Sequence, residues 1–138
     1  MKYILDANVV SALMGNQPGI VEKLARLSRA DVAVPQPVFA EIAYGIERLP
    51  RSKRRDALRL RFELVRGELR HAEWSDDVSE AFGRIKSDLE RRGRRIEDFD
   101  AAVAAHALAI GAVLVTRNAK HMARIEDLEI EDWSAGPS

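Results

Sequence analysis

The chain has 138 residues, 46% of them hydrophobic, and it contains no cysteine. This composition excludes an intrinsically disordered chain, and the lack of thiols excludes disulfides, thiolate metal sites and a cysteine nucleophile. Because 22 basic residues balance 22 acidic ones, the net charge of zero does not indicate an anionic partner. The length favours one domain spanning residues 1–138. There is neither a membrane-spanning apolar run nor a signal-peptide pattern, so we expect a cytoplasmic protein without membrane contact.

Short apolar runs alternate with helical patterns along the chain, which predicts an α/β fold with parallel strands. Strands are expected at residues 2–5, 32–34, 70–74, 113–115 and 128–130. Helices are expected at residues 8–15, 18–27, 35–49, 52–69, 75–92 and 101–110. Asn8 is the expected cap of the first helix, and Gly111 is expected to end the last one.

Three acidic residues are placed where they would meet at one edge of such a sheet. Asp6 follows the first strand, Glu41 lies in the helix after the second strand, and Asp100 precedes an alanine-rich helix. Ligands of open parallel sheets bind outside the carboxyl ends of the strands. Carboxylates in apolar surroundings are costly unless they are paired or bind a cation. The pattern therefore predicts a Mg²⁺ or Mn²⁺ site suited to phosphoryl chemistry.

Each acid also has a purely structural interpretation. Asp6 could cap the following helix, and Glu41 could be a solvated helix residue. Asp98 and Asp100 could complement a helix dipole, and for Asp98 a role as cap or as support for the site is the preferred interpretation. Small apolar residues follow Asp100, so few polar side chains lie near its carboxylate in the sequence. The convergence of Asp6, Glu41 and Asp100 favours a functional site.

Two basic clusters interrupt the charge balance. The first contains Arg51, Lys53, Arg54, Arg55, Arg59 and Arg61, and the second contains Arg91, Arg92, Arg94 and Arg95. Solvated helix faces with local ion pairs are the usual role of such clusters. They could instead hold an RNA backbone through phosphate contacts, which give affinity but little sequence choice. The candidates for RNA contact are Arg51, Lys53, Arg54, Arg55 and Arg117.

Four segments of the chain carry a family resemblance: YILDANVVSAL, VPQPVFAEIAYGI, RIEDFDAAVAAHALAIGAVLVTRN and LEIEDW. In this order and spacing they resemble the PIN-domain ribonucleases and, within them, the VapC-type toxins of toxin–antitoxin pairs. The resemblance runs nearly end to end. It implies a three-layer α/β/α sandwich around a parallel sheet of four to five strands. It also implies a Mg²⁺-dependent endoribonuclease (Mn²⁺ a possible substitute) that acts on RNA, is blocked by a cognate antitoxin and forms a homodimer.

The resemblance also assigns roles to individual residues. Asp6, Glu41 and Asp100 match the family's metal-binding acids, and we expect Asp6 and Asp100 to hold the ion directly. Glu41 would bind the ion through water or orient the nucleophile. Thr116 and Asn118 match the polar residues at the strand end and, with Asn8, are expected to support the acids.

One position departs from the family pattern. A fourth acid commonly follows the Thr-x-Asn motif, but this chain has His121 and then Met122. Histidine is a poor ligand for Mg²⁺ and an acceptable one for Mn²⁺. His121 therefore indicates either a weak or absent second metal position, or a loop residue without a ligand role. His106 is interpreted as a satisfied core or interface histidine.

Two other functional classes were weighed. A phosphoacceptor receiver domain would need an acidic pair after the first strand and a lysine after a late strand. This chain offers only Asp6 and Lys120 there, so that class is disfavoured. The other alternative is a catalytically weak PIN-like module that binds RNA or protein. The substitution at His121 suggests it, and the three remaining acids argue against it.

Overall fold

The computed structural model describes residues 2–134, and its centre is a five-stranded sheet in which every neighbouring pair is parallel. The strand order is β3-β2-β1-β4-β5. The strands are β1 (Tyr3–Leu5), β2 (Val32–Pro35), β3 (Arg70–Ala72), β4 (Val113–Val115) and β5 (Ile130–Glu131). The predicted parallel sheet is confirmed, including the two shorter strands expected at 70–74 and 128–130.

Helices connect the strands and cover the sheet. They are α1 (Ala7–Met14), α2 (Pro18–Ala25), α3 (Gln36–Glu47), α4 (Lys53–Glu68), α5 (Asp76–Arg91), α6 (Asp98–Ile110) and α7 (Ala119–Met122), with a short 3₁₀ turn, η1 (Arg29–Asp31). Helix α7 and η1 were not predicted, because segments of three or four residues are too short to show a hydrophobic period. None of the helices within residues 2–134 has the length and apolarity needed to cross a membrane.

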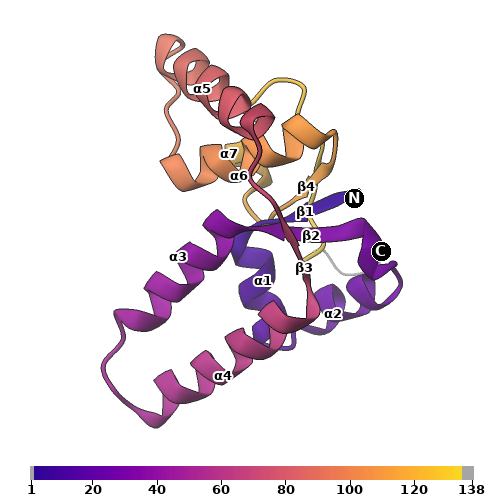
Figure 1. Cartoon of the computed structure of the whole chain (residues 1–138), viewed down its shortest axis with the longest axis vertical. Helices are drawn as coiled ribbons and strands as arrows, with labels where there is room; N and C mark the ends of the chain where they lie inside the picture. The colour runs from indigo at the N-terminus through magenta and orange to yellow at the C-terminus, as the bar shows by residue number, and fades with distance from the viewer. Residues whose placement is uncertain (1, 135–138) are drawn as a thin grey trace.

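The helices form the outer layers of a three-layer sandwich. Figure 1 shows α5 and α6 on one side of the strands and α1, α2 and α4 on the other. Helices α3 and α4 run antiparallel to each other and form an arm that projects away from the sheet (Figure 1). The predicted α/β/α architecture is therefore confirmed.

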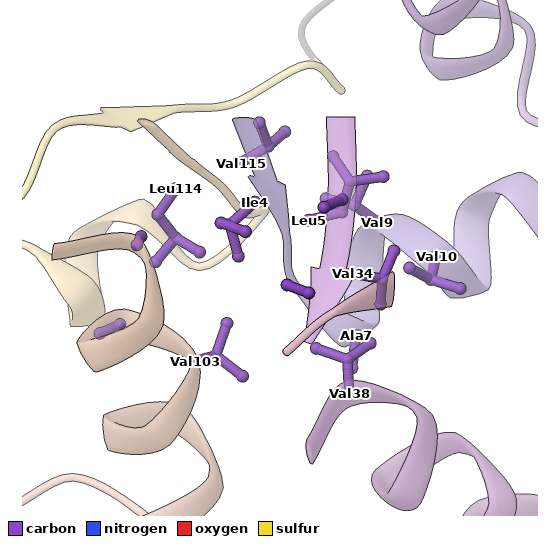
Figure 2. Packing of buried hydrophobic residues seen from close by; sticks show 14 of the residues in the cluster. Ile4, Leu5, Ala7, Val9, Val10, Val34, Val38, Val103, Leu114 and Val115 are labelled. Carbon is purple, nitrogen blue, oxygen red and sulfur yellow. The ribbon is translucent and has the colours of Figure 1, made fainter. Parts of the chain in front are cut away.

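Alternation along the central strands fills both sides of the sheet. Ile4 and Leu114 lie toward Val103 of α6, whereas Leu5 and Val34 lie on the side of α1 (Figure 2). The four strand residues are fully buried. Because successive residues of a strand point to opposite faces, β1 contributes to the core on both sides. Packing on both sides therefore fixes the end of this central strand at Leu5, directly before Asp6.

Two helix starts differ from the sequence prediction. Asp6, not Asn8, is the N-cap of α1, and its Oδ1 accepts a hydrogen bond of 2.8 Å from the Ala7 amide. Helix α6 begins at Asp98, so Glu97 is its N-cap residue and the expected capping role of Asp98 is wrong. In both cases the helix begins earlier than its apolar pattern, because polar residues of a first turn carry no hydrophobic period.

Candidate active site

Asp6 lies at the C-terminal edge of the sheet, where β1 and β4 end side by side. The register pairs Leu5 with Val115, and the Asp6 amide donates to the Val115 carbonyl at 2.9 Å. Thr116 directly follows β4, and its hydroxyl donates a hydrogen bond to Asp6 Oδ2 at 2.8 Å. Strand pairing thus fixes both residues at one level, although 110 positions separate them in sequence.

The Asp6 carboxylate is buried, with 4% of the residue exposed. Burial raises its pKa above the usual 3.8, and the hydrogen bonds from Thr116 and the Ala7 amide oppose that rise only in part. Loss of hydration disfavours the charged form, which is the physical cause of the increase. An acid kept in this state needs a reason beyond capping, because a capping carboxylate is equally effective at the surface.

Glu41 and Asp100 are half-buried neighbours of Asp6. Burial is the main cause of the raised pKa of Glu41, and the charges of Asp6 and Asp100 raise it further. Burial followed by the charge of Asp6 likewise raises the pKa of Asp100. The three predicted acids, from the end of β1, the second turn of α3 and the first turn of α6, are thus linked through the effects of their charges on one another's pKa. We call them the carboxylate cluster.

Thr116 is the centre of a polar network behind the carboxylate cluster. Its Oγ1 accepts from Asn8 Nδ2 at 3.3 Å and from the Asn118 amide at 3.0 Å, while its own proton goes to Asp6. Asn8 Oδ1 accepts in turn from the Arg117 amide at 3.1 Å. Of the residues expected to support the acids, Thr116 therefore contacts Asp6 directly, and Asn8 and the Asn118 amide contact Thr116.

These features can be compared with known proteins. The PIN domain family matches residues 3–128. The chain belongs to the PIN-domain family. Ribonuclease VapC1 of Haemophilus influenzae is 32% identical over 139 residues, covering 97% of this chain and 99% of the relative. The tRNA(fMet)-specific endonuclease VapC of Shigella flexneri is 27% identical, with 97% and 99% covered. A solved structure of VapBC2 from Rickettsia felis, bound to a promoter DNA fragment, superposes with a TM-score of 0.85 at 28% identity, covering 96% of this chain and 99% of that one.

His121 of this PIN domain lies beside the carboxylate cluster. It is in α7, and its Nε2 is 3.8 Å from Asp100 Oδ2. The charge of His121 lowers the pKa of Asp100, against the larger effect of burial. The residue that departs from the family pattern is therefore next to the site, in a short helix and not in a loop as expected. The preferred interpretation, that it has no ligand role, stays a prediction.

Other predicted residues have different partners in the structure. Asp98 is exposed, and its Oδ1 pairs with Lys86 Nζ of α5 at 3.0 Å. Arg55 fastens α4 to the end of α3, through Nε to the Ile46 carbonyl at 3.2 Å and an ion pair with Glu47 at 2.9 Å. To support the site, Asp98 would have to break its ion pair with Lys86. To contact RNA, Arg55 would have to break its contacts with Ile46 and Glu47. In contrast, the side chains of Arg51, Lys53, Arg54 and Arg117 are exposed.

His106 differs from its interpretation as a satisfied core histidine. It is 1% exposed and packs edge-on against Trp74, but its Nδ1 has no hydrogen-bond partner within residues 2–134. Its neighbours on α6 are mainly alanines, which offer no polar group. Burial lowers the pKa of His106, because loss of hydration disfavours the protonated ring.

Sequence reasoning overlooked Glu97 as a neighbour of the site. Its charge also raises the pKa of Asp100. The sequence signal was a group of acids at positions 97, 98 and 100, which does not by itself distinguish Glu97 from Asp98. Helical geometry decides otherwise, because Asp98 turns to Lys86 while Glu97 stays on the side of Asp100.

The donor set of the carboxylate cluster fits a hard divalent cation. Carboxylate oxygens are the ligands that Mg²⁺ and Mn²⁺ prefer, and the cluster lacks the sulfur ligands of softer metals. Across residues 2–134, no three acidic or histidine side chains are already gathered closely enough to hold an ion. The charges of Asp6 and Asp100 nevertheless raise the pKa of Glu41, and the charge of Asp6 raises that of Asp100.

The raised pKa of Glu41 makes stability depend on pH when metal is absent. Its ionisation destabilises the folded state increasingly as pH rises from its usual value of 4.5 through the raised pKa. In EDTA, Glu41→Gln should therefore raise the melting temperature more at about pH 7.5 than at about pH 4.5. Calorimetric melts of parent and variant at both pH values would measure this, and comparison of the two proteins cancels the contribution of His106. An equal effect at both pH values would contradict the coupling.

Proposed function

We propose that this protein is the toxin of a toxin–antitoxin pair and an endoribonuclease that requires Mg²⁺, with Mn²⁺ as a substitute. The buried Asp6 in a cluster of three mutually repelling carboxylates is the observation that carries the proposal. Such a cluster is unfavourable without a cation, so binding an ion would relieve it. The likeness to VapC ribonucleases over nearly the whole chain supports the same reaction class.

Asp6 and Asp100 would hold the ion directly, with Glu41 contacting it through water or orienting the attacking water. When bound, the ion supplies Lewis acidity at the scissile phosphate, and it offsets the negative field that would otherwise repel RNA. Thr116 keeps Asp6 in one rotamer through its hydrogen bond of 2.8 Å. Hydrolysis at such a site leaves a 5′-phosphate and a 3′-hydroxyl. The exposed Arg51, Lys53, Arg54 and Arg117 would contact phosphates away from the cleaved bond.

A cognate antitoxin is the expected protein partner. The Rickettsia felis structure is of VapBC2, and a second solved relative is VapBC-1 of Haemophilus influenzae, with a TM-score of 0.82 at 29% identity. We propose that this chain likewise pairs with an antitoxin that blocks the carboxylate cluster, that it forms a homodimer and that it acts in the cytoplasm.

The decisive experiment is RNA cleavage by purified protein with Mg²⁺, with Mn²⁺ and with EDTA. Total tRNA is a suitable first substrate, because the Shigella flexneri relative is a tRNA(fMet)-specific endonuclease. We expect cleavage with either metal, none with EDTA, and growth arrest on induction that the neighbouring reading frame relieves. Cleavage that persists in EDTA would refute the metal requirement. RNA binding without cleavage under all conditions would instead favour the catalytically weak module, for which His121 beside Asp100 is the supporting observation.

His121→Asp tests the position at which this chain departs from its family. An added carboxylate beside Asp100 would give a hard cation one more oxygen ligand. We expect tighter Mg²⁺ binding by calorimetry, and a larger gain in cleavage at limiting Mg²⁺ than at limiting Mn²⁺, because imidazole is the poorer ligand for Mg²⁺. Equal Mg²⁺ affinity and stoichiometry in the two proteins would place His121 outside the metal shell.

A further inference from the structure

Two exposed aromatic side chains adjoin the carboxylate cluster. Phe99 immediately precedes Asp100 in α6 and is 48% exposed, and Tyr44 follows Glu41 by three residues in α3 and is 67% exposed. Residues three apart lie on neighbouring parts of one helix face, about 4.5 Å apart along the axis. Neither ring belongs to the hydrophobic core, so both are free to contact a ligand beside the acids.

Phe99 borders a hollow of about 330 Å³ that it shares with Arg95 and His121. Because His121 lies 3.8 Å from Asp100, this hollow lies beside the carboxylate cluster. Its size is at the lower end of sites that hold small organic ligands. Glu97 and Asp98 also line it, but Arg95 offsets one of these charges and Lys86 pairs with Asp98, so the lining carries no strong net charge. An uncharged planar group such as a nucleobase suits both the ring and this lining.

Basic side chains surround Tyr44 on the arm formed by α3 and α4. The guanidinium of Arg48, one turn further, lies 6.0 Å from the centroid of the Tyr44 ring. Arg51, Lys53 and Arg54 continue the positive charge at the exposed turn beyond α3. An aromatic ring accompanied by cations is the combination that binds single-stranded nucleic acids, because bases stack on the ring while phosphates meet the cations.

We propose that Phe99 and Tyr44 are base-stacking platforms that hold unpaired RNA at the carboxylate cluster, one from α6 and one from α3. The inference rests on the proposed function and adds two residues, outside the carboxylate cluster, that position the RNA. Bases in a duplex are stacked on each other and cannot reach a protein ring, whereas those in loops can. Stacking tolerates any base, so the platforms select strand state and not sequence.

The test uses Phe99→Leu and Tyr44→Leu, which keep apolar bulk and remove the ring, and Phe99→Trp and Tyr44→Trp, which restore one. Fluorescence anisotropy with a labelled single-stranded RNA oligonucleotide in EDTA measures binding without cleavage. Each leucine variant should bind at least about 5-fold more weakly than the parent, and each tryptophan variant should bind as well or better. With Mg²⁺, the leucine variants should raise KM and leave kcat near the parent value. The same oligonucleotide in a duplex should bind weakly to every variant.

Matched controls are Ile110→Ala, at the far end of α6, and Leu60→Ala in α4, both exposed apolar residues away from the acids. They should bind RNA like the parent. If the leucine variants bind and cleave single-stranded RNA like the parent, the proposed stacking role is refuted. This holds even if the same variants bind the antitoxin poorly. The proposed function would still stand if the parent's cleavage required metal. Conversely, weakened binding by the leucine variants with no cleavage in any metal would uphold the platforms and refute the enzyme.

Discussion

Asp100→Asn should abolish RNA cleavage while leaving the fold at least as stable as in the parent. The substitution removes one of the two carboxylates expected to hold the ion directly. Changes to outer residues of metal sites already reduce activity about 10- to 100-fold, so loss of a direct ligand should reduce cleavage by more than about 100-fold. In EDTA the melting temperature should stay equal or rise. Burial and the charge of Asp6 raise the pKa of Asp100, so at neutral pH its charge opposes folding.

Asp88→Asn provides the matched control for this substitution. Asp88 lies in α5, away from the hollow beside Phe99, and pairs with Arg92, so its loss should leave cleavage within about a factor of two of the parent, as for most surface changes. Cleavage rates and calorimetric melts of the three proteins make the comparison. If Asp100→Asn melts well below the parent in EDTA, then Asp100 supports the fold and its assignment to the site fails.

Thr116→Val should reduce both stability and cleavage, although it changes the side-chain shape very little. Valine removes the donor to Asp6 and the acceptor used by Asn8 and by the Asn118 amide. Because Thr116 is completely buried, valine would leave these polar groups without a hydrogen-bond partner, which should lower the free energy of unfolding by about 1–3 kcal/mol. Cleavage should fall about 10- to 100-fold, as expected when the group that orients a metal ligand is lost.

Thr116→Ser separates the hydroxyl from the methyl group. Serine keeps all three hydrogen bonds, so it should restore most of the cleavage rate while losing only the packing of one methyl group. Denaturant unfolding and cleavage rates of both variants, measured at saturating Mg²⁺, would test this. A valine variant that cleaves RNA at the parent rate would show that the hydroxyl of Thr116 does not position Asp6.

Individual residues show which features of the fold and the site could be predicted from the sequence. The parallel sheet and the three acids were predictable, because strand periodicity locates the C-terminal edge and each acid follows or adjoins an element that ends there. The partner of Asp98 was not, since its pairing with Lys86 depends on how α5 packs against α6. Arg55 was indistinguishable from its basic neighbours in sequence, yet its position relative to the end of α3 gives it carbonyl partners that Arg54 lacks.

The two oxygens of Asp6 have consequences for the energetics of ion capture. Oδ1 accepts from the Ala7 amide and Oδ2 from Thr116, so the rotamer of Asp6 is fixed before any ion arrives. A carboxylate has about four lone-pair positions, which leaves two for a cation. On binding an ion, Asp6 would therefore lose little rotational entropy. The larger loss would fall on Glu41 and Asp100, which are less buried. Selectivity among divalent ions should consequently depend on how far these two side chains can approach a fixed anchor, with smaller ions demanding the longer approach.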